Sequence, residues 1–193
     1  MKKINEIFYS LQGEGLHAGT PAVFIRFSGC NLKCPFCDTD HKEGRMMPDE
    51  EIAREAAKYP AEWIILTGGE PTLQLDEKLL ETLKKTGKKI AIETNGTRSV
   101  PAGVDFVTVS PKFQFCDHAE LKVTECDELK VVFSGCDDIS VYDAIKARHR
   151  FLQPCDTGDE ERNKNITSEA VLYCKEHPQW RLSLQQQKIL DIR

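Results

Sequence analysis

Three of the eight cysteines in this 193-residue chain lie within one short segment. Cys30, Cys34 and Cys37 have the spacing C-x3-C-x2-C. Three thiolates on one loop can hold a soft metal ion or an iron–sulfur cluster. A structural zinc site needs four ligands, whereas a four-iron cluster held by three cysteines leaves one iron open to bind another molecule. The spacing therefore indicates a metal centre in this segment.

A zinc site is the alternative interpretation of the same segment. His41 comes four residues after Cys37 and could supply the fourth ligand. Structural zinc sites usually combine paired C-x2-C half-sites, and this triplet does not have that form. A chain with such a site would be a zinc-stapled interaction module rather than an enzyme.

The other five cysteines are scattered, and no two of them form a C-x2-C pair. They could in principle hold an auxiliary cluster, but we expect small buried hydrophobic residues or incidental thiols. The N-terminal segment has two lysines but no apolar stretch of the kind that a secretory signal requires. We therefore expect a cytoplasmic protein whose thiols stay reduced. The scattered cysteines are Cys116, Cys126, Cys136, Cys155 and Cys174.

The composition excludes several classes of protein. Acidic residues exceed basic ones by 31 to 26, and a formal net charge of −5 argues against a protein that coats nucleic acid. Hydrophobic residues make up 40% of the chain, which is ordinary for a folded domain. The apolar stretches run only five to six residues, far short of a membrane span. We therefore expect one folded domain with no nucleic-acid or membrane partner.

Short apolar segments alternate with amphipathic ones along the chain, which predicts an α/β fold with a mainly parallel sheet. A complete eight-fold barrel takes about 250 residues, so we expect a partial, open barrel in which some helices are missing. The predicted strands are 22–28, 63–68, 89–96, 104–110, 129–135, 150–154 and 180–184, the predicted helices are 48–59, 75–87, 138–150 and 168–177, and 153–167 is a predicted loop.

The distinctive motifs follow the predicted strands. GCNLKCPFCDT follows the first strand, GGEP the second, ETNG lies at the third, SPK follows the fourth, and QP lies at a later one. Because the carboxyl ends of parallel strands meet at one edge of a sheet, these motifs should share one site.

The cysteine segment GCNLKCPFC resembles the signature of the radical S-adenosylmethionine (SAM) superfamily. Phe36, directly before the last cysteine, and the later GGEP segment also match that superfamily. The resemblance implies that Cys30, Cys34 and Cys37 hold a 4Fe–4S cluster whose open iron binds SAM. One electron then cleaves SAM to methionine and a 5′-deoxyadenosyl radical. It also implies a partial (βα) barrel of the radical SAM type.

A closer resemblance covers nearly the whole chain. FYSLQGEGLHAGTP, LTGGEP, IAIETNGT, VSPK, FLQP and the C-terminal LSLQ look like motifs of the 7-carboxy-7-deazaguanine synthase family. That family converts 6-carboxy-5,6,7,8-tetrahydropterin to 7-carboxy-7-deazaguanine with loss of ammonia, in the pathway to queuosine and other 7-deazapurines, and requires magnesium. The resemblance implies a radical carbon–nitrogen lyase with a single domain over 1–193. An N-terminal substrate loop (about 8–20) and a C-terminal tail (about 180–193) would complete the active site.

The resemblance also implies a role for each matched residue, with none acting as a general acid or base. Thr39 matches a magnesium ligand, and because one hydroxyl is a weak ligand the ion would be held mainly by substrate and water. The substrate-binding set is Leu11, Gln12, Gly13, Glu14, Arg26, Thr67 and Arg193, the last through its main-chain carboxylate. The SAM-binding set is Phe36, Asp38, Gly69, Glu70, Glu93, Asn95, Ser110, Lys112, Gln153 and Asp156.

One position departs from the family pattern, because Gln187 stands where family members commonly have histidine. An amide can donate and accept hydrogen bonds but cannot carry a proton, so we expect a binding role there. The implied partners are a flavodoxin or ferredoxin that supplies the electron and a second copy of the chain in a homodimer. A glycyl-radical-enzyme activase is the enzymatic alternative, because such activases share the cysteine spacing. The LQGEG segment and the C-terminal motif argue against it.

Overall fold

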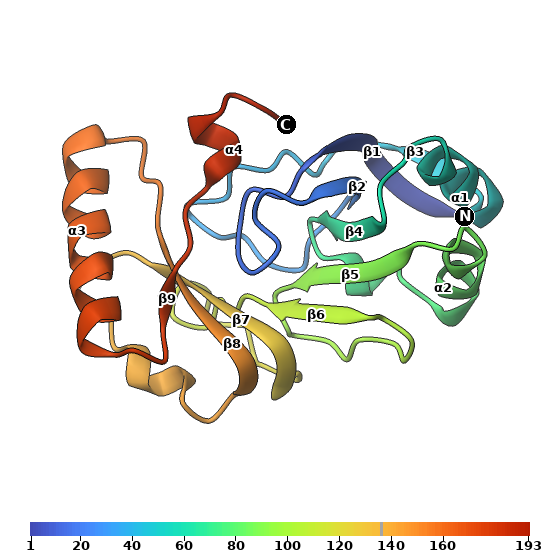
Figure 1. Ribbon diagram of the computed structural model, residues 1–193. Coiled ribbons are helices and arrows are strands. Elements are labelled where there is room, and N and C mark those ends of the chain that lie inside the picture. Colours follow the sequence, from blue (N-terminus) through green and yellow to red (C-terminus); the bar gives the residue numbers. More distant parts are fainter. Residues whose placement is uncertain (136) are drawn as a thin grey trace.

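The parallel strands of this protein form an open sheet with helices packed at its two ends (Figure 1). The computed structural model describes residues 1–135 and 137–193, so Cys136 lies outside the described residues. The strands are β1 (Lys2–Leu11), β2 (Pro21–Phe27), β3 (Arg45–Met47), β4 (Trp63–Gly68), β5 (Lys89–Thr94), β6 (Phe106–Val109), β7 (Glu125–Phe133), β8 (Lys146–Pro154) and β9 (Arg181–Leu182).

The strand order confirms the predicted partial, open barrel. Within the described residues the sheet has nine strands in the order β3-β1-β2-β4-β5-β6-β7-β8-β9. Strand β2 and the strands from β4 to β9 pair in parallel, whereas β1 runs antiparallel to β2 and β3. The order begins at β3 and ends at β9, so the sheet does not close on itself in the described part of the chain.

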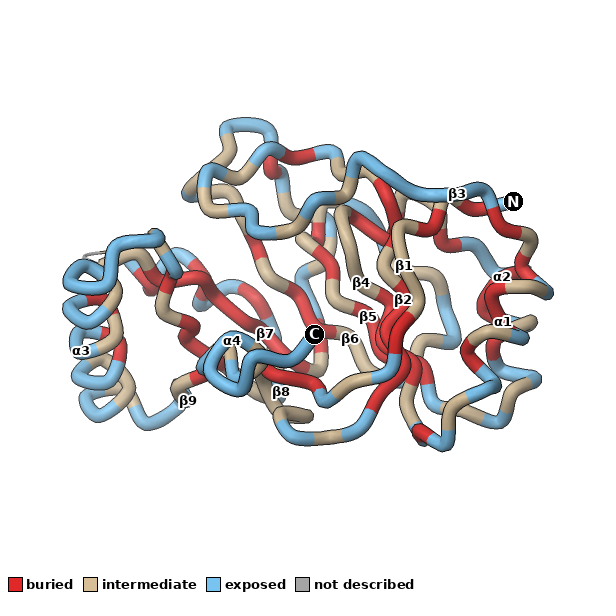
Figure 2. Tube along the Cα trace, turned by 90° about the horizontal axis from the view of Figure 1, so that it is seen from above, coloured by how far each residue is buried: buried red, intermediate tan, exposed pale blue. Residues whose placement is uncertain are grey.

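The helices cover the two ends of the sheet and leave its middle uncovered. The α-helices are α1 (Asp49–Ala57), α2 (Glu77–Lys84), α3 (Glu160–Glu176) and α4 (Gln186–Ile189), and the 3-10 helices are η1 (Pro71–Leu73) and η2 (Ile139–Tyr142). Helices α1 and α2 pack against the β1–β5 half, and α3 packs on β8 and β9 (Figure 2). None of the described helices has the length and apolar character that crossing a bilayer would need.

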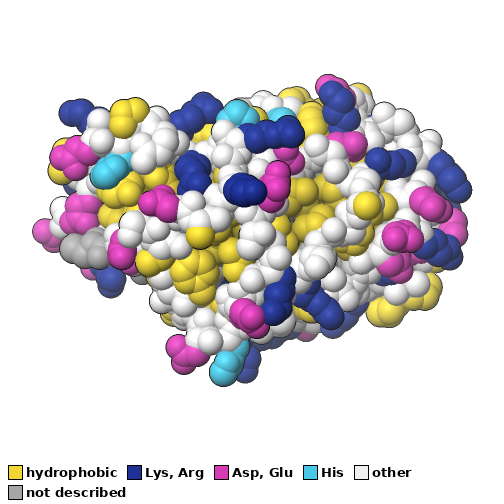
Figure 3. Space-filling view, turned by 90° about the horizontal axis from the view of Figure 1, so that it is seen from below, with side chains coloured by type: hydrophobic (Ala, Val, Ile, Leu, Met, Phe, Trp, Pro, Cys, Tyr) yellow, Lys and Arg dark blue, Asp and Glu magenta, His cyan; other side chains and the backbone are white. Residues whose placement is uncertain are grey.

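Strand β6 lies in the middle of the sheet, between the half covered by α1 and α2 and the end covered by α3, and apolar side chains lie beside it. Seen from below, hydrophobic side chains gather in the middle of the molecule, between more charged ends (Figure 3). Val100, Val104, Val107 and Val123 line a shallow groove beside β6. In the described residues the connections β5–β6 and β6–β7 contain no helix, which agrees with the prediction that some helices are missing.

The predicted helix over 138–150 is wrong. Only Ile139–Tyr142 is helical, as the 3-10 helix η2, and β8 already begins at Lys146. Parallel pairing with β7 joins Cys126 to Ala147 and continues to Phe133 and Pro154, so the sheet overrides the local helix propensity. Ile139, Tyr142 and Ile145 bury one side of this turn at a spacing of three residues, which suits a 3-10 helix.

The predicted loop over 153–167 is also wrong in its second half. Helix α3 begins at Glu160, eight residues before the predicted start at Ser168. Its first turns are polar, and only Ile166 and Ala170 are buried along the helix, so the apolar periodicity is weak there. Strands β1 and β3 and helix α4 were not predicted from the sequence, because these segments alternate too little or are too short to show a clear pattern.

Asp159 supplies the start signal of α3, and we expect it to stabilise that helix. Its side chain accepts a hydrogen bond of 3.0 Å from the Arg162 amide. Replacing Asp159 by Ala should lower the free energy of unfolding in urea by about 1 kcal/mol, because an amide of the first turn loses its acceptor. Asp159→Asn keeps an acceptor oxygen and should retain most of the stability. An Asn variant as unstable as the Ala variant would contradict this assignment.

Candidate active site

One cavity of about 1370 Å³ opens where the parallel strands end. Its walls include the ends of β4, β5, β7 and β8, the segment after β6, the loop between β1 and β2, and the C-terminal tail. Every site residue predicted from the sequence lines this cavity except Glu70. Because the carboxyl ends of the parallel strands meet at one edge of the sheet, motifs that are far apart in the chain come together here.

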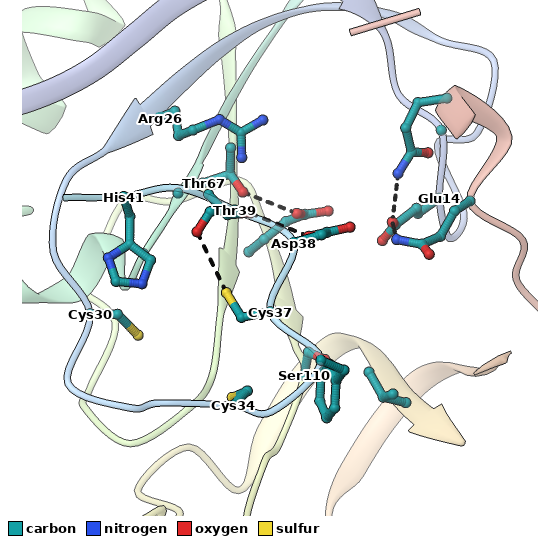
Figure 4. Close-up of a pocket in the computed structure, with 18 of the residues that line it drawn as sticks. Glu14, Arg26, Cys30, Cys34, Cys37, Asp38, Thr39, His41, Thr67 and Ser110 are labelled. Carbon is teal, nitrogen blue, oxygen red and sulfur yellow. Dashed lines mark hydrogen bonds between the residues drawn. The ribbon is translucent and has the colours of Figure 1, made fainter. Parts of the chain in front are cut away.

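The cysteine loop, residues 28–44, connects β2 to β3 and contributes all three clustered thiols. Cys30, Cys34 and Cys37 line the cavity, and Figure 4 shows their side chains around one space beside Arg26 and Thr67. The loop closes on itself through a hydrogen bond of 2.7 Å from the Gly29 amide to the His41 carbonyl.

The donor set fits an iron–sulfur cluster. Burial raises the pKa of Cys30, and it raises the pKa of Cys34 to about 12. Partly buried thiols of this kind become thiolate ligands when bound iron supplies positive charge. The zinc alternative needs four ligands around one ion, and among the described residues no three His, Cys, Asp or Glu side chains, Cys30, Cys34 and Cys37 included, lie within reach of a single metal ion.

The fold brings Cys116, one of the scattered cysteines, into contact with the clustered ones. It follows β6, and its Sγ lies 3.8 Å from Sγ of Cys34. Cys155 also lines the cavity, whereas Cys126 is buried in the core around β7.

The GGEP segment packs directly against the cysteine loop. The amides of Gly69 and Glu70 donate to the carbonyls of Phe27 and Gly29 at 3.0 and 2.9 Å. A Cβ atom on Gly69 would lie 2.0 Å from the Gly29 carbonyl oxygen, and Gly68 has a φ of +122°. Only glycine fits these two conditions, so the two glycines fix the distance between the cluster loop and the end of β4.

Glu70 does not line the cavity but stabilises the segments that do. It is fully buried, and Oε1 accepts from the Thr72 amide, the Thr72 hydroxyl and the Thr94 hydroxyl at 3.0, 2.5 and 2.7 Å. Its Oε2 accepts from the Asn95 amide at 2.8 Å. Glu70 therefore joins the end of β4 to the end of β5 and fixes the ETNG segment.

A buried network of charged and amide groups lies across the cavity from the cysteines. Lys130 on β7 donates to Oε2 of Glu14 at 2.5 Å and to Oε1 of Glu93 at 3.1 Å. Gln12 donates to Glu93 at 3.0 Å, and the Thr67 hydroxyl does so at 3.2 Å. Glu93, matched to SAM binding in the sequence, thus lies among the residues of the predicted substrate set.

Glu14 is ionised in this network. Burial alone would raise the pKa of Glu14, but the adjacent Lys130 ammonium and its hydrogen bond outweigh that cost. Amide donors from Gln187 at 2.9 Å and Gln185 at 3.2 Å add to the effect, and the pKa of Glu14 falls to about 2. Gln187 therefore acts as a hydrogen-bond donor to Glu14.

The loop between β1 and β2, residues 12–20, is tied to the opposite half of the sheet. The Leu16 amide donates to Glu128 on β7 at 2.7 Å, and the Gly15 amide donates to the Ser183 hydroxyl at 3.0 Å. The Gln186 amide donates to the Gly13 carbonyl at 3.1 Å. These contacts bring Glu14 over the cavity and close part of the open side of the barrel.

The C-terminal tail reaches both walls of the cavity. Lys188 pairs with Asp38 of the cysteine loop at 2.9 Å and with Asp156 after β8 at 2.8 Å. The hydrogen bond from Lys188 lowers the pKa of Asp156 to about 2, together with donors from Gly158 and Asn163.

Arg193 lies at the entrance beside Arg26, and both guanidinium groups contact Glu6. Arg26 Nε is 2.9 Å from Glu6 Oε1, and Arg193 Nη2 is 3.0 Å from Glu6 Oε2. The Ser10 hydroxyl donates to the main-chain carbonyl of Arg193 at 2.6 Å.

The remaining predicted residues line the same space from separate elements. Phe36 packs edge-on against Phe115, with ring centroids 4.8 Å apart. The Lys112 ammonium donates to the Ser110 carbonyl at 2.6 Å, and burial lowers the pKa of Lys112 to about 8. Thr39 lies beside Asp38 in the cysteine loop, with its hydroxyl 3.5 Å from Oδ1. Leu11, Gly69, Gln153 and Asp156 complete the lining.

Sequence reasoning missed Lys130, Gln185 and Cys116. A signal existed for Lys130, because it is a charged residue inside the apolar strand segment ELKVVF, as Arg26 is inside AVFIRFS. No pattern in the sequence indicates Cys116 or Gln185, because their place in the site depends on how the loop after β6 and the C-terminal tail fold back.

Comparisons with known proteins agree with this geometry. Residues 24–113 match the family model described as the radical SAM superfamily. The chain is 55% identical to a 7-carboxy-7-deazaguanine synthase of Bacteroides thetaiotaomicron over the full length of both chains. It is 40% identical to the enzyme of that name from Nitratidesulfovibrio vulgaris, with 98% of each chain covered.

Solved structures show the same fold. The crystal structure of QueE from Escherichia coli matches with a TM-score of 0.80 and 29% identity, covering 96% of this chain and 94% of that one. Streptococcus suis SuiB, solved bound to S-adenosylmethionine, matches with a TM-score of 0.52 and 15% identity, covering 80% of this chain and 44% of that one.

Because four hydrogen-bond donors point at the Glu70 carboxylate, we expect even the small change Glu70→Gln to destabilise the folded protein. Glu70→Gln places an amide donor among the donors that now point at a carboxylate, so we expect the free energy of unfolding to fall by about 2–3 kcal/mol. Glu62→Gln is the control, since Glu62 is exposed, and it should change stability by less than about 0.5 kcal/mol. Equal stability of the two variants in urea would show that the Glu70 contacts do not stabilise the fold.

Proposed function

This chain belongs to the 7-carboxy-7-deazaguanine synthase family of the radical SAM superfamily, and we propose that it converts 6-carboxy-5,6,7,8-tetrahydropterin to 7-carboxy-7-deazaguanine with release of ammonia. The observation that best supports the proposal is the shared cavity. It has three cysteines of the radical SAM motif on one wall and the Glu14–Lys130–Glu93 network on the other. Such a carbon–nitrogen lyase needs a redox centre and a binding site for a polar heterocycle within reach of each other.

Cys30, Cys34 and Cys37 would hold a 4Fe–4S cluster, which together with SAM supplies the one-electron chemistry that starts the reaction. SAM would lie against the end of β5 and the SPK segment. There the Asn95 and Lys112 side chains offer hydrogen-bond donors, and Phe36 offers an aromatic edge. Glu70 would act indirectly by fixing the Asn95 backbone.

The substrate would bind between the network and Arg26. Glu14 and Glu93 face the cavity as acceptors for the N–H groups of the pterin ring. Arg26 donates only Nε to Glu6, and in Figure 4 the end of its guanidinium points into the cavity, where it could bind the substrate carboxylate. The main-chain carboxylate of Arg193 would lie at the same entrance.

The proposal also includes a magnesium ligand, an electron donor, a homodimer and a cytoplasmic location. Thr39 lines the cavity beside Asp38 and would provide one oxygen ligand to Mg²⁺. A flavodoxin or ferredoxin would supply the electron, and two chains would pair as a homodimer. A reducing cytoplasm would suit an enzyme that depends on free thiols beside its cluster.

The proposed reaction is tested by anaerobic turnover. Reconstituted enzyme with carboxytetrahydropterin, SAM, Mg²⁺ and dithionite should form a product with the mass of 7-carboxy-7-deazaguanine. Each SAM should support many turnovers. An activase would instead consume SAM stoichiometrically and would leave the pterin unchanged. Absence of the deazapurine from an enzyme with a full cluster would refute the proposal.

Cysteine variants separate cluster ligands from neighbours. Cys30→Ala, Cys34→Ala and Cys37→Ala should each lose most of the iron, from about four per chain, and most of the brown absorbance. Cys116→Ser is the matched control, because Cys116 lies 3.8 Å from Cys34 but is outside the triplet, and it should keep its iron. Loss of iron from the Cys116 variant comparable with that of Cys34→Ala would contradict a three-cysteine site.

A further inference from the structure

Lys130 is a buried cation among carboxylates. It lies on β7, it is 5% exposed, and it contacts Glu14 and Glu93 at 2.5 and 3.1 Å. These carboxylates come from distant parts of the chain, Glu14 from the β1–β2 loop and Glu93 from the end of β5. A single ammonium therefore connects three elements that line the cavity.

The charges around Lys130 do not balance. Glu14, Glu93 and Glu128 all raise its pKa, so the ammonium keeps its proton despite the cost of burial. Lys130 pairs directly with two carboxylates, Glu14 and Glu93, whereas burial raises the pKa of Glu128. One ammonium thus faces two carboxylates, and burial lowers the pKa of another cation of the cavity, Lys112, to about 8. Buried negative charge that lacks a partner is costly, so the cavity favours a ligand that presents several N–H donors.

The three carboxylates differ in their exposure to the cavity. Glu128 is 3% exposed, accepts from the Leu16 amide at 2.7 Å, and does not line the cavity. Glu14 and Glu93 do line it. Glu128 and Lys130 share one face of β7 because side chains alternate along a strand. Lys130 thus contacts two acceptors that a ligand can reach, while Glu128 fixes the backbone of the loop that carries one of them.

We propose that Lys130 is a positioning residue for the substrate. Its ammonium holds Glu14 and Glu93 in place as a pair of hydrogen-bond acceptors for the donor edge of the pterin ring. Loss of the ammonium leaves two carboxylates that repel one another, so that Glu14 turns away or takes up a proton. A protonated carboxyl presents a donor to the N–H groups of the ring and binds them poorly. The inference rests on the proposed function, which names the pterin.

A binding experiment with the complete holoenzyme tests this role. The probe is pterin-6-carboxylic acid, an oxidised relative of the substrate that does not turn over, titrated calorimetrically with SAM present. Lys130→Met should weaken its binding by about 30-fold at pH 8, because two charge-assisted contacts lose their common donor. Lys130→Arg keeps the charge and should restore binding to within about fivefold of wild type. Affinity for SAM alone should be the same in all three proteins.

The pH dependence of pterin binding separates a positioning role of Lys130 from a merely structural one. In the wild type the pKa of Glu14 is about 2, so lowering the pH from 8 to 6 leaves this carboxylate ionised. In Lys130→Met burial still raises the pKa of Glu14 and the opposing charge is gone, so affinity for the pterin should fall further as the pH is lowered. Glu93, Glu128 and Lys112 face the same region and are common to both proteins.

Three outcomes would overturn the inference. They are a Lys130→Met enzyme that binds the pterin within twofold of wild type, a pH dependence equal to that of wild type, and an equal loss of affinity for SAM and pterin. Lys130→Gln replaces the Met variant if the latter does not fold, and the same results are expected. Turnover by the wild-type preparation is measured alongside. A wild type that neither binds nor converts the pterin would refute the proposed function itself, whereas a failed inference leaves that turnover intact.

Discussion

The ends of the parallel strands from β2 to β8 meet at one cavity, and the whole site depends on that convergence. The cysteine loop follows β2, the GGEP segment follows β4, and Glu93 is the residue before the last one of β5. The barrel is open, so the β1–β2 loop and the C-terminal tail supply the missing wall through contacts to Glu128 and Ser183. A site built in this way needs few helices, which explains how a short chain can enclose a large cavity.

The cavity has two chemically different walls. One wall carries thiols, together with Lys112. The other carries the carboxylates of Glu14 and Glu93, which pair with Lys130, and this pairing lowers the pKa of Glu14. Soft sulfur ligands suit iron, and ionised oxygen acceptors suit a ring with N–H donors. The separation places a redox group and a heterocycle side by side without competition for the same ligands.

The sequence predicted the fold class, most of the strands and a set of site residues of which all but Glu70 line the cavity, because motifs at strand ends follow a simple geometric rule. It could not predict β8 beyond its last residues, since the charged segment around Lys146 and Arg148 favours a helix until β7 pairs with it. It also missed Cys116, whose approach to Cys34 depends on an irregular loop. Glu70 lies in the expected place but hydrogen-bonds within the chain, and only the structure shows its four donors.

The central claim is that three cysteines hold a cluster with one iron left open for SAM. Electron paramagnetic resonance of the dithionite-reduced enzyme tests it most directly, with spectra recorded before and after SAM is added. The account predicts the signal of one reduced 4Fe–4S cluster whose g values shift when SAM is added, because the cosubstrate binds the open iron. A cluster signal that saturating SAM leaves unchanged would contradict it, since the fourth position would then be closed by a ligand from the protein.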